Sequence, residues 1–202
     1  MTKYSVNHIL ALLFLPAALL LAGCATTADK RVDFLYETVG VATGGYGDIY
    51  LGQDARPREG NEWLLGTITD KDGKKLGNIT TITAPSDMIR DAFTQELEAA
   101  GYRVDPVETL QPDMAKGVRI SSVTIRLDEV SSLLKRDATC SIHLVLEPWR
   151  NGSALNKRRY DVDYSLSALS DSDRLLPEIV QKALHGLMKR SVPELVTIIE
   201  QK

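Results

Sequence analysis

The chain has 202 residues and a formal net charge of −3, with 25% charged and 44% hydrophobic residues. These values are typical of one globular body with a sizeable core, and a second full domain is not expected. The slightly acidic balance argues against nucleic acid as a partner, because that class of ligand calls for a basic face.

The first stretch of the chain has the pattern of an export signal. Lys3 supplies a positive charge, residues 9–21 are apolar with one interruption at Pro16, and Leu21-Ala-Gly-Cys24 follows. Small residues before a cysteine suit a protease that cuts there. This motif resembles the lipobox of bacterial lipoprotein precursors. The resemblance implies that residues 1–23 are a signal peptide that is removed, and that Cys24 receives a diacylglyceryl thioether and an acylated amino group.

Two other interpretations of this stretch stay open. It could be an uncleaved transmembrane anchor, although its strongly apolar part runs only from Ile9 to Ala22, and a spanning helix needs about 20 residues. It could also be an ordinary secretory peptide that is cut near Ala25, in which case Cys24 would be discarded.

Lipidation of Cys24 would determine how the protein meets the membrane. Two or more acyl chains hold a protein stably on a bilayer. The residue after the cysteine is Ala25 rather than Asp, which by the same resemblance favours the outer membrane, on its periplasmic face. We then expect residues 24–31 to be a lipid-anchored tether and residues 32–202 to form a single α+β periplasmic domain.

The chain contains two cysteines, and lipidation of Cys24 would leave Cys140 without a disulfide partner. Every second residue from Ala138 to Leu144 is apolar, and Cys140 is one of these residues. This pattern predicts that Cys140 lies in the core of a strand and packs there as a small apolar side chain.

In the first half of the chain, β-prone residues predict a strand between Val32 and Val41 and strands on both sides of Asp70-Lys-Asp-Gly73, which is a hairpin signal. Residues 52–61 read as an exposed loop. Ser86 is expected to cap a helix that Gly101 ends, because glycine readily adopts the left-handed conformation of a helix C-cap.

In the second half, three alternating runs predict strands over residues 118–127, 139–149 and 160–168. The alternation changes phase at Ser121-Ser122, which predicts a β-bulge. Residues 171–173 are expected to cap a last helix, and Pro193 is expected to kink or split it.

The order of strands, helix, strands and helix favours an α+β fold. We expect a largely antiparallel sheet with two helices packed on one face.

Pro85-Ser-Asp-Met-Ile-Arg90, Leu97 and Gly101-Tyr102, together with the order of elements from Leu65 to Ile199, resemble the YajG-type family of small bacterial lipoproteins. More distantly, the arrangement is similar to the fold shared by the N-terminal domain of TolB and the lipoproteins that activate penicillin-binding proteins. The resemblance implies an envelope location and a non-enzymatic role, and only Cys24 is carried over as a functional residue.

No residue pattern in the sequence predicts catalysis, a metal site or a cofactor. Cys140 and His143 are three apart in a predicted strand, so their side chains point to opposite faces and cannot act together as nucleophile and base. His185 has no second histidine or cysteine near it in sequence. Asp161 and Asp163 share one strand face and have no evident acid and base environments.

One concentrated basic run remains as a candidate interaction site. It consists of Trp149, Arg150, Lys157, Arg158, Arg159 and Tyr160. A hairpin tip of this composition could touch an acidic partner or anionic lipid head groups, although a merely solvated tip would look the same.

These observations lead to two hypotheses. The first is a lipid-anchored, non-enzymatic interaction or assembly module at the outer membrane that binds another envelope protein. The alternative is a transport or assembly factor for lipid or lipopolysaccharide, similar to LptE-type or transport-auxiliary lipoproteins. A carrier should show an apolar groove between helix and sheet.

Overall fold

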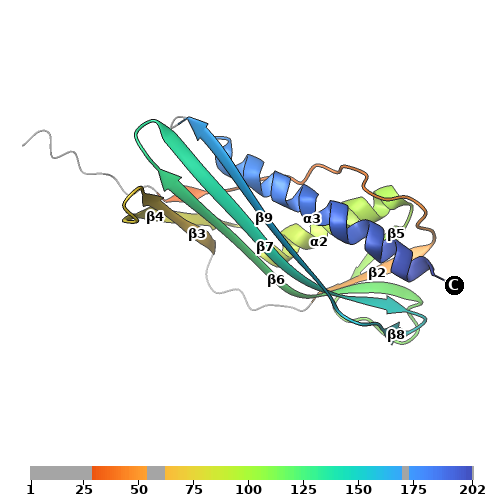
Figure 1. Cartoon of the computed structure of the whole chain (residues 1–202). Helices are drawn as coiled ribbons and strands as arrows, with labels where there is room; N and C mark the ends of the chain where they lie inside the picture. The colour runs from red at the N-terminus through yellow and green to blue at the C-terminus, as the bar shows by residue number, and fades with distance from the viewer. Residues whose placement is uncertain (1–28, 54–61, 170–172, 202) are drawn as a thin grey trace, which may run out of the picture.

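The computed structural model describes residues 29–53, 62–169 and 173–201. In these residues, nine strands form one sheet and two helices cover it (Figure 1). The strands are β1 (Lys30–Arg31), β2 (Asp48–Gln53), β3 (Trp63–Asp70), β4 (Lys75–Thr81), β5 (Arg103–Val107), β6 (Lys116–Ser131), β7 (Lys135–Arg150), β8 (Ser153–Ala154) and β9 (Arg158–Leu169). The helices are α2 (Pro85–Ala100) and α3 (Leu175–Glu200).

Strand β6 connects the two parts of the sheet. Along one edge it pairs in parallel with β2 near its start and with β3 near its end. Along the other edge it pairs over its whole length with β7, which is antiparallel and in turn pairs with β9. The long strands β6 and β7 therefore run along the length of the sheet, and β9 accompanies β7 from Lys135 to Leu146 (Figure 1).

The expectation of a largely antiparallel sheet with two helices on one face is wrong. The sheet is mixed, because β1–β4, β2–β5, β2–β6 and β3–β6 are parallel pairs. The helices also do not share one face: α3 packs on β7 and β9, whereas α2 packs on β6, β5 and β2 and against α3. One part of the sheet contains β2 and β3, and the other contains β7 and β9. The sheet curls around the helices because these two parts diverge from β6.

The core lies between the curled sheet and the helices. Along α3, Ile179, Ala183, Leu187 and Leu195 have no exposed surface. Phe93 of α2 is likewise fully buried. This core is the main source of stability, since burial of apolar surface is the dominant favourable term in folding.

Several local predictions are confirmed. The register of β6 against β7 shifts between Ile120 and Ser122, which is the expected bulge. The turn after β3 has Gly73 at φ 81°, and α2 ends at Gly101 with φ 112°. Cys140 is fully buried. These features depend on short stretches of sequence, which is why the sequence pattern was sufficient to predict them.

The predicted strand over residues 32–41 does not form. Lys30 and Arg31, at the end of the expected tether, form β1, and the chain then crosses α2 without joining the sheet. Glu96, which is buried in α2, accepts hydrogen bonds from the Tyr36 hydroxyl (2.7 Å) and from the backbone N–H of Val39 (2.7 Å). The carboxylate of Glu96 thus accepts hydrogen bonds that the backbone of a neighbouring strand would otherwise accept.

Two expectations about the helices are also wrong, namely the N-cap at Ser86 and a split at Pro193. The N-cap residue of α2 is Ala84, which makes no side-chain cap, and Ser86 lies inside the helix. Pro193 lies inside α3, which continues without a break to Glu200. The burial of Val192, Leu195 and Ile199 on either side of Pro193 keeps the helix intact despite the lost backbone hydrogen bond. Residues 171 and 172 of the expected cap lie outside the described residues.

Gly66 of β3 provides a test of the close approach between β3 and β6. A Cβ atom at this position would collide with the carbonyl oxygen of Leu127. We expect Gly66→Ala to lower the free energy of unfolding by about 1–3 kcal/mol, because the two strands must separate to admit the methyl group.

Urea-induced unfolding followed by circular dichroism measures this change. The control is Leu64→Ala in the same strand, where the side chain is exposed. That change should stay within about 0.5 kcal/mol. If the two substitutions lowered the free energy of unfolding equally, the close approach of β3 and β6 at Gly66 would not be the cause.

Candidate functional site

The six residues of the predicted basic patch lie in the half of β7 and β9 that is farther from the β6–β7 turn, and we call them the basic end. Trp149 and Arg150 finish β7, Arg158 to Tyr160 begin β9, and Lys157 lies in the turn between them. Lys157, Arg158 and Arg159 are exposed. The structure therefore brings the residues together, as a hairpin end that also carries β8.

Two members of the basic end hold the C-terminal half of α3. Nη1 of Arg150 donates to the carbonyl oxygens of Ile198 (3.1 Å) and Gln201 (2.9 Å). The hydroxyl of Tyr160 is buried and donates to Oε2 of Glu194 at 3.0 Å. Burial, with the neighbouring Glu194 carboxylate, raises the pKa of Tyr160. Both side chains are structural.

The other residues of the basic end are held by weaker contacts. Nε of Arg158 lies 3.5 Å from Oε1 of Glu194, and Nζ of Lys157 lies 3.8 Å from Oε2 of Glu147. Trp149 is half-buried, and its indole N–H has no partner among the described residues. The surface that could meet a partner is thus formed by Lys157, Arg158 and Arg159.

The residues considered for catalysis are apart, as the strand alternation predicts. Cys140 is fully buried, and burial, with the charge of Asp163, raises the pKa of its thiol to about 12. His143 is exposed on the opposite face, where its Nδ1 lies 2.6 Å from Oδ1 of Asp161. His185 contacts the carbonyl oxygen of Glu37 at 2.8 Å. Within the described ranges, no group of three or more His, Cys, Asp or Glu could hold a metal ion.

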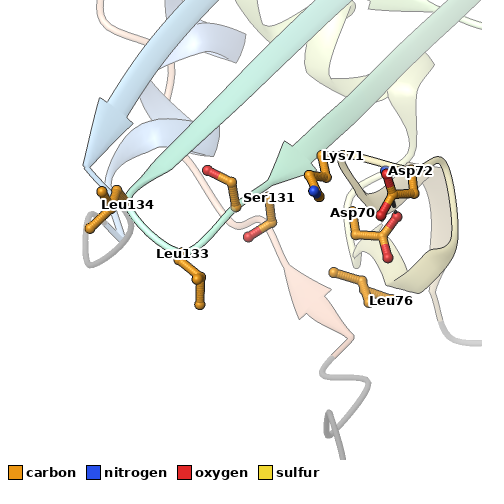
Figure 2. A pocket seen from close by; sticks show the side chains of 8 residues that line it. Asp70, Lys71, Asp72, Leu76, Ser131, Leu133 and Leu134 are labelled. Carbon is orange, nitrogen blue, oxygen red and sulfur yellow. Dashed lines mark hydrogen bonds between the residues drawn. The ribbon is translucent and has the colours of Figure 1, made fainter.

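A second surface, at the opposite end of the sheet, was missed by the sequence analysis. A pocket of about 570 Å³ lies between the β3–β4 turn and the β6–β7 turn (Figure 2). The residues that line it are Asp70, Lys71, Asp72, Leu76, Ser131, Ser132, Leu133 and Leu134. Figure 2 shows Leu133 and Leu134 on the loop that joins β6 to β7.

Three leucines at this end are unusually exposed, and we call them the leucine tip. The exposed fractions are 95% for Leu133, 80% for Leu134 and 72% for Leu169. Leu169 belongs to the tip because it pairs with Lys135, the first residue after the turn. A signal was present in the sequence, since Ser131-Ser-Leu-Leu134 places two large apolar residues in a turn, where polar ones are usual.

The described chain begins at this same end. Lys30, in β1, donates to Oε1 of Glu129 at 2.9 Å, and Nη2 of Arg136 donates to Oε2 of Glu129 at 2.6 Å. We call Lys30, Glu129 and Arg136 the tether triad. Burial of Glu129 would raise its pKa, but the hydrogen bonds from Arg136 and Lys30 outweigh it and keep this pKa below its ordinary value. Cys24 itself lies outside the described residues.

The region where a lipid carrier would need a groove is filled. On α3, Ile179, Ala183 and Leu187 face the sheet with no exposed surface, and Leu144 of β7 is fully buried as well. Within the described residues, neither helix combines the length and the apolarity that crossing a bilayer requires.

No protein-family model matches the chain, and no curated protein matches it in sequence. Solved structures that it resembles include a Xanthomonas campestris protein of family DUF330, with 12% identity and a TM-score of 0.44 over 84% of this chain and 92% of that one. A minor lipoprotein from Acinetobacter baumannii has 12% identity and a TM-score of 0.33 over 80% of this chain and 89% of that one.

A Helicobacter pylori protein described as a neuraminyllactose-binding hemagglutinin homolog has 11% identity and a TM-score of 0.38 over 83% of this chain and 93% of that one. The neighbours therefore include bacterial proteins, one of them a lipoprotein. They do not confirm membership of the YajG-type family.

The tether triad generates a stability prediction. Glu129→Gln should lower the free energy of unfolding by about 1.5–3 kcal/mol at neutral pH, because it removes the negative charge that accepts hydrogen bonds from the buried Arg136 and from Lys30. Urea-induced unfolding measures it. The control is Glu178→Gln, which breaks an exposed pair with Lys182 and should cost no more than about 0.5 kcal/mol.

The pH dependence of the same variant follows from the lowered pKa of Glu129. A carboxyl whose pKa is lower in the folded state stabilises the fold above its unfolded pKa, and this stability is lost as the pH falls through the folded value. The difference between wild type and Glu129→Gln should therefore shrink below about pH 4. A difference that stays constant down to pH 2 would show that the charge of Glu129 is not its cause.

Proposed function

We propose that this protein is a lipid-anchored, non-enzymatic interaction module at the periplasmic face of the outer membrane, and that its basic end binds an acidic surface of another envelope protein. The observation that carries the proposal is the position of the two surfaces. The described chain begins at the end with the tether triad, whereas Arg158 and Arg159 of the basic end pair with Leu146 and Val145, toward the other end of β7.

The separation of the two ends is large. Arg158 pairs with Leu146, which lies ten residues along β7 from Arg136, and at about 3.3 Å per residue this corresponds to roughly 33 Å. If Cys24 holds the protein to the bilayer, the basic end can lie far from the lipid head groups. Electrostatic attraction is screened over about 8 Å at physiological ionic strength. An acidic protein partner therefore suits the basic end better than anionic lipids of the anchoring membrane.

The alternative, a carrier for lipid or lipopolysaccharide, has less support. A carrier needs space for acyl chains between helix and sheet, and the side chains of α3 that face β7 and β9 are fully packed there.

The anchor is tested by Cys24→Ala. Metabolic labelling with a fatty acid should mark the wild type and not the variant, because the thiol of Cys24 is the acceptor implied by the lipobox-like motif. Membrane fractionation of the same cells should place only the wild type with outer-membrane proteins. Equal labelling of both chains would disprove the assignment of Cys24.

The basic end is tested by replacing Lys157, Arg158 and Arg159 with Ser. These side chains are exposed and their ion pairs are long, so each change should alter the free energy of unfolding by no more than about 0.5 kcal/mol. Crosslinking in cells, followed by identification of the captured proteins, should show a partner that the wild type retains and the variant loses. The wild-type complex should weaken as salt is added.

The matched control removes the same charge elsewhere. Arg174, Lys182 and Lys189 are exposed cations of the α3 region, and their replacement with Ser should leave the captured partner unchanged. The proposal fails if the basic-end variant folds normally and still captures every partner at the wild-type yield.

A further inference from the structure

We propose that the leucine tip docks on the bilayer that carries the lipid anchor, with Leu133, Leu134 and Leu169 inserted at the boundary between head groups and acyl chains. The inference rests on the proposed lipidation of Cys24 and adds a second membrane contact, made by the folded domain itself. It follows from the exposure of these leucines, the geometry of their turn and the place where the chain enters the fold.

The exposure of the tip calls for a partner. Leu133 and Leu134 project from the β6–β7 loop at the rim of the pocket (Figure 2). Leu169 adds a third apolar side chain from the end of β9, opposite Lys135. Single exposed leucines are common on protein surfaces, but a cluster at the extreme end of a hairpin marks an interaction surface.

Ser132 and Lys135, at the two ends of the turn, already have partners for some of their backbone groups. The backbone N–H of Ser132 donates to the carbonyl oxygen of Lys135 at 2.8 Å, and the Ser132 hydroxyl donates to the same oxygen at 2.8 Å. The N–H of Lys135 donates to Oγ of Ser132 at 3.2 Å. Backbone groups that already have partners within the turn need no water, which is the condition for placing a loop in an apolar medium.

The chain enters the fold beside the tip. Lys30 is bonded to Glu129, two residues before the end of β6, and Ser131 at that end pairs with Arg136. The segment between Cys24 and Lys30 spans at most roughly 20 Å when fully extended. A lipid on Cys24 therefore holds this end of the sheet, and not the basic end, close to the bilayer.

The charges around the tip are mixed. Lys71 and Lys135 are exposed next to it, where long cationic side chains can extend toward lipid phosphates. Asp70 and Asp72 line the same pocket, and Oδ1 of Asp70 is used by the N–H groups of Asp72 (2.9 Å) and Lys74 (2.8 Å). Docking should thus depend on the leucines and should be insensitive to salt.

A second copy of the chain fits the tip less well. Three leucine side chains offer on the order of a few hundred Å², whereas a stable protein interface buries about 1,200–2,000 Å². A bilayer imposes no such minimum, because insertion needs only to assist an anchor that is already present.

The experiment uses the mature, lipidated protein that begins at Cys24, in phospholipid vesicles, with a tryptophan placed at the tip by Leu133→Trp. Vesicles that contain brominated phospholipid quench tryptophan emission at the depth of the acyl chains. The emission of Trp63 and Trp149 in the wild type is subtracted. The matched control is Ser153→Trp, an exposed position in β8 at the basic end.

We expect the brominated vesicles to quench the added emission of Leu133→Trp at least threefold more than that of Ser153→Trp, with no change between low and high salt. Equal quenching of the two variants overturns the inference. So does a blue-shifted Leu133→Trp emission that bromine does not quench and that grows with protein concentration, since this result assigns the tip to a second copy. Unchanged thermal unfolding of both variants shows that they are folded.

Fatty-acid labelling of the same preparations separates this inference from the proposed function. Lipidated protein with an unquenched tip refutes the docking and leaves the anchor intact. Unlipidated protein with a quenched tip refutes the anchor and supports the docking. Unlipidated and unquenched protein refutes both.

Discussion

The placement of both ends of the molecule depends on one buried carboxylate, Glu129. It has no exposed surface and binds Lys30 from β1 and Arg136 from β7, so a single group joins the start of the described chain to the longest hairpin of the sheet. Strand β1 has only two residues paired with β4, and such a short ladder would fray without a further contact. The ion pairs, together with the hydrogen bond from the N–H of Val32 to the carbonyl oxygen of Thr80 (2.8 Å), thus hold the start of the described chain on the sheet.

Two other glutamates, Glu96 and Glu200, likewise bind segments whose positions the sequence patterns did not predict. Glu96 receives the crossing segment through Tyr36 and Val39, and Glu200 at the end of α3 accepts hydrogen bonds from Lys116 (2.6 Å) and Tyr102 (2.7 Å). The partners lie about sixty to a hundred residues apart in the sequence. Apolar periodicity carries no information about such pairs, and the residues 32–41 were predicted as a strand because β-prone composition was the only signal available.

The same distinction explains which parts of the fold could be predicted. The bulge after Ile120, the turn at Gly73 and the C-cap at Gly101 depend on a few neighbouring residues, and their patterns predicted them correctly. The direction of strand pairing depends on distant partners, since β2 and β3 both run parallel to β6. Of the candidate surfaces, the basic run was visible as composition, whereas the sequence of the turn indicated only Leu133 and Leu134 of the leucine tip, and Leu169 joins them through the pairing of β9 with β7.

The arrangement of the two surfaces has a mechanical consequence. One acyl anchor fixes a point but not a direction, and a domain held only at Cys24 would tilt freely, so that its basic end would sweep over the membrane as well as away from it. A second contact at the leucine tip would define an axis along β6 and β7 and hold Arg158 of the basic end roughly 33 Å from the bilayer. The entropy lost on binding a partner would then be smaller, because the orientation of the basic end is already restricted. Three features serve the same purpose: the rigidity of the long hairpin, the contacts of Arg150 and Tyr160 with α3, and the tether triad. Each keeps the position of one end of the sheet constant relative to the other.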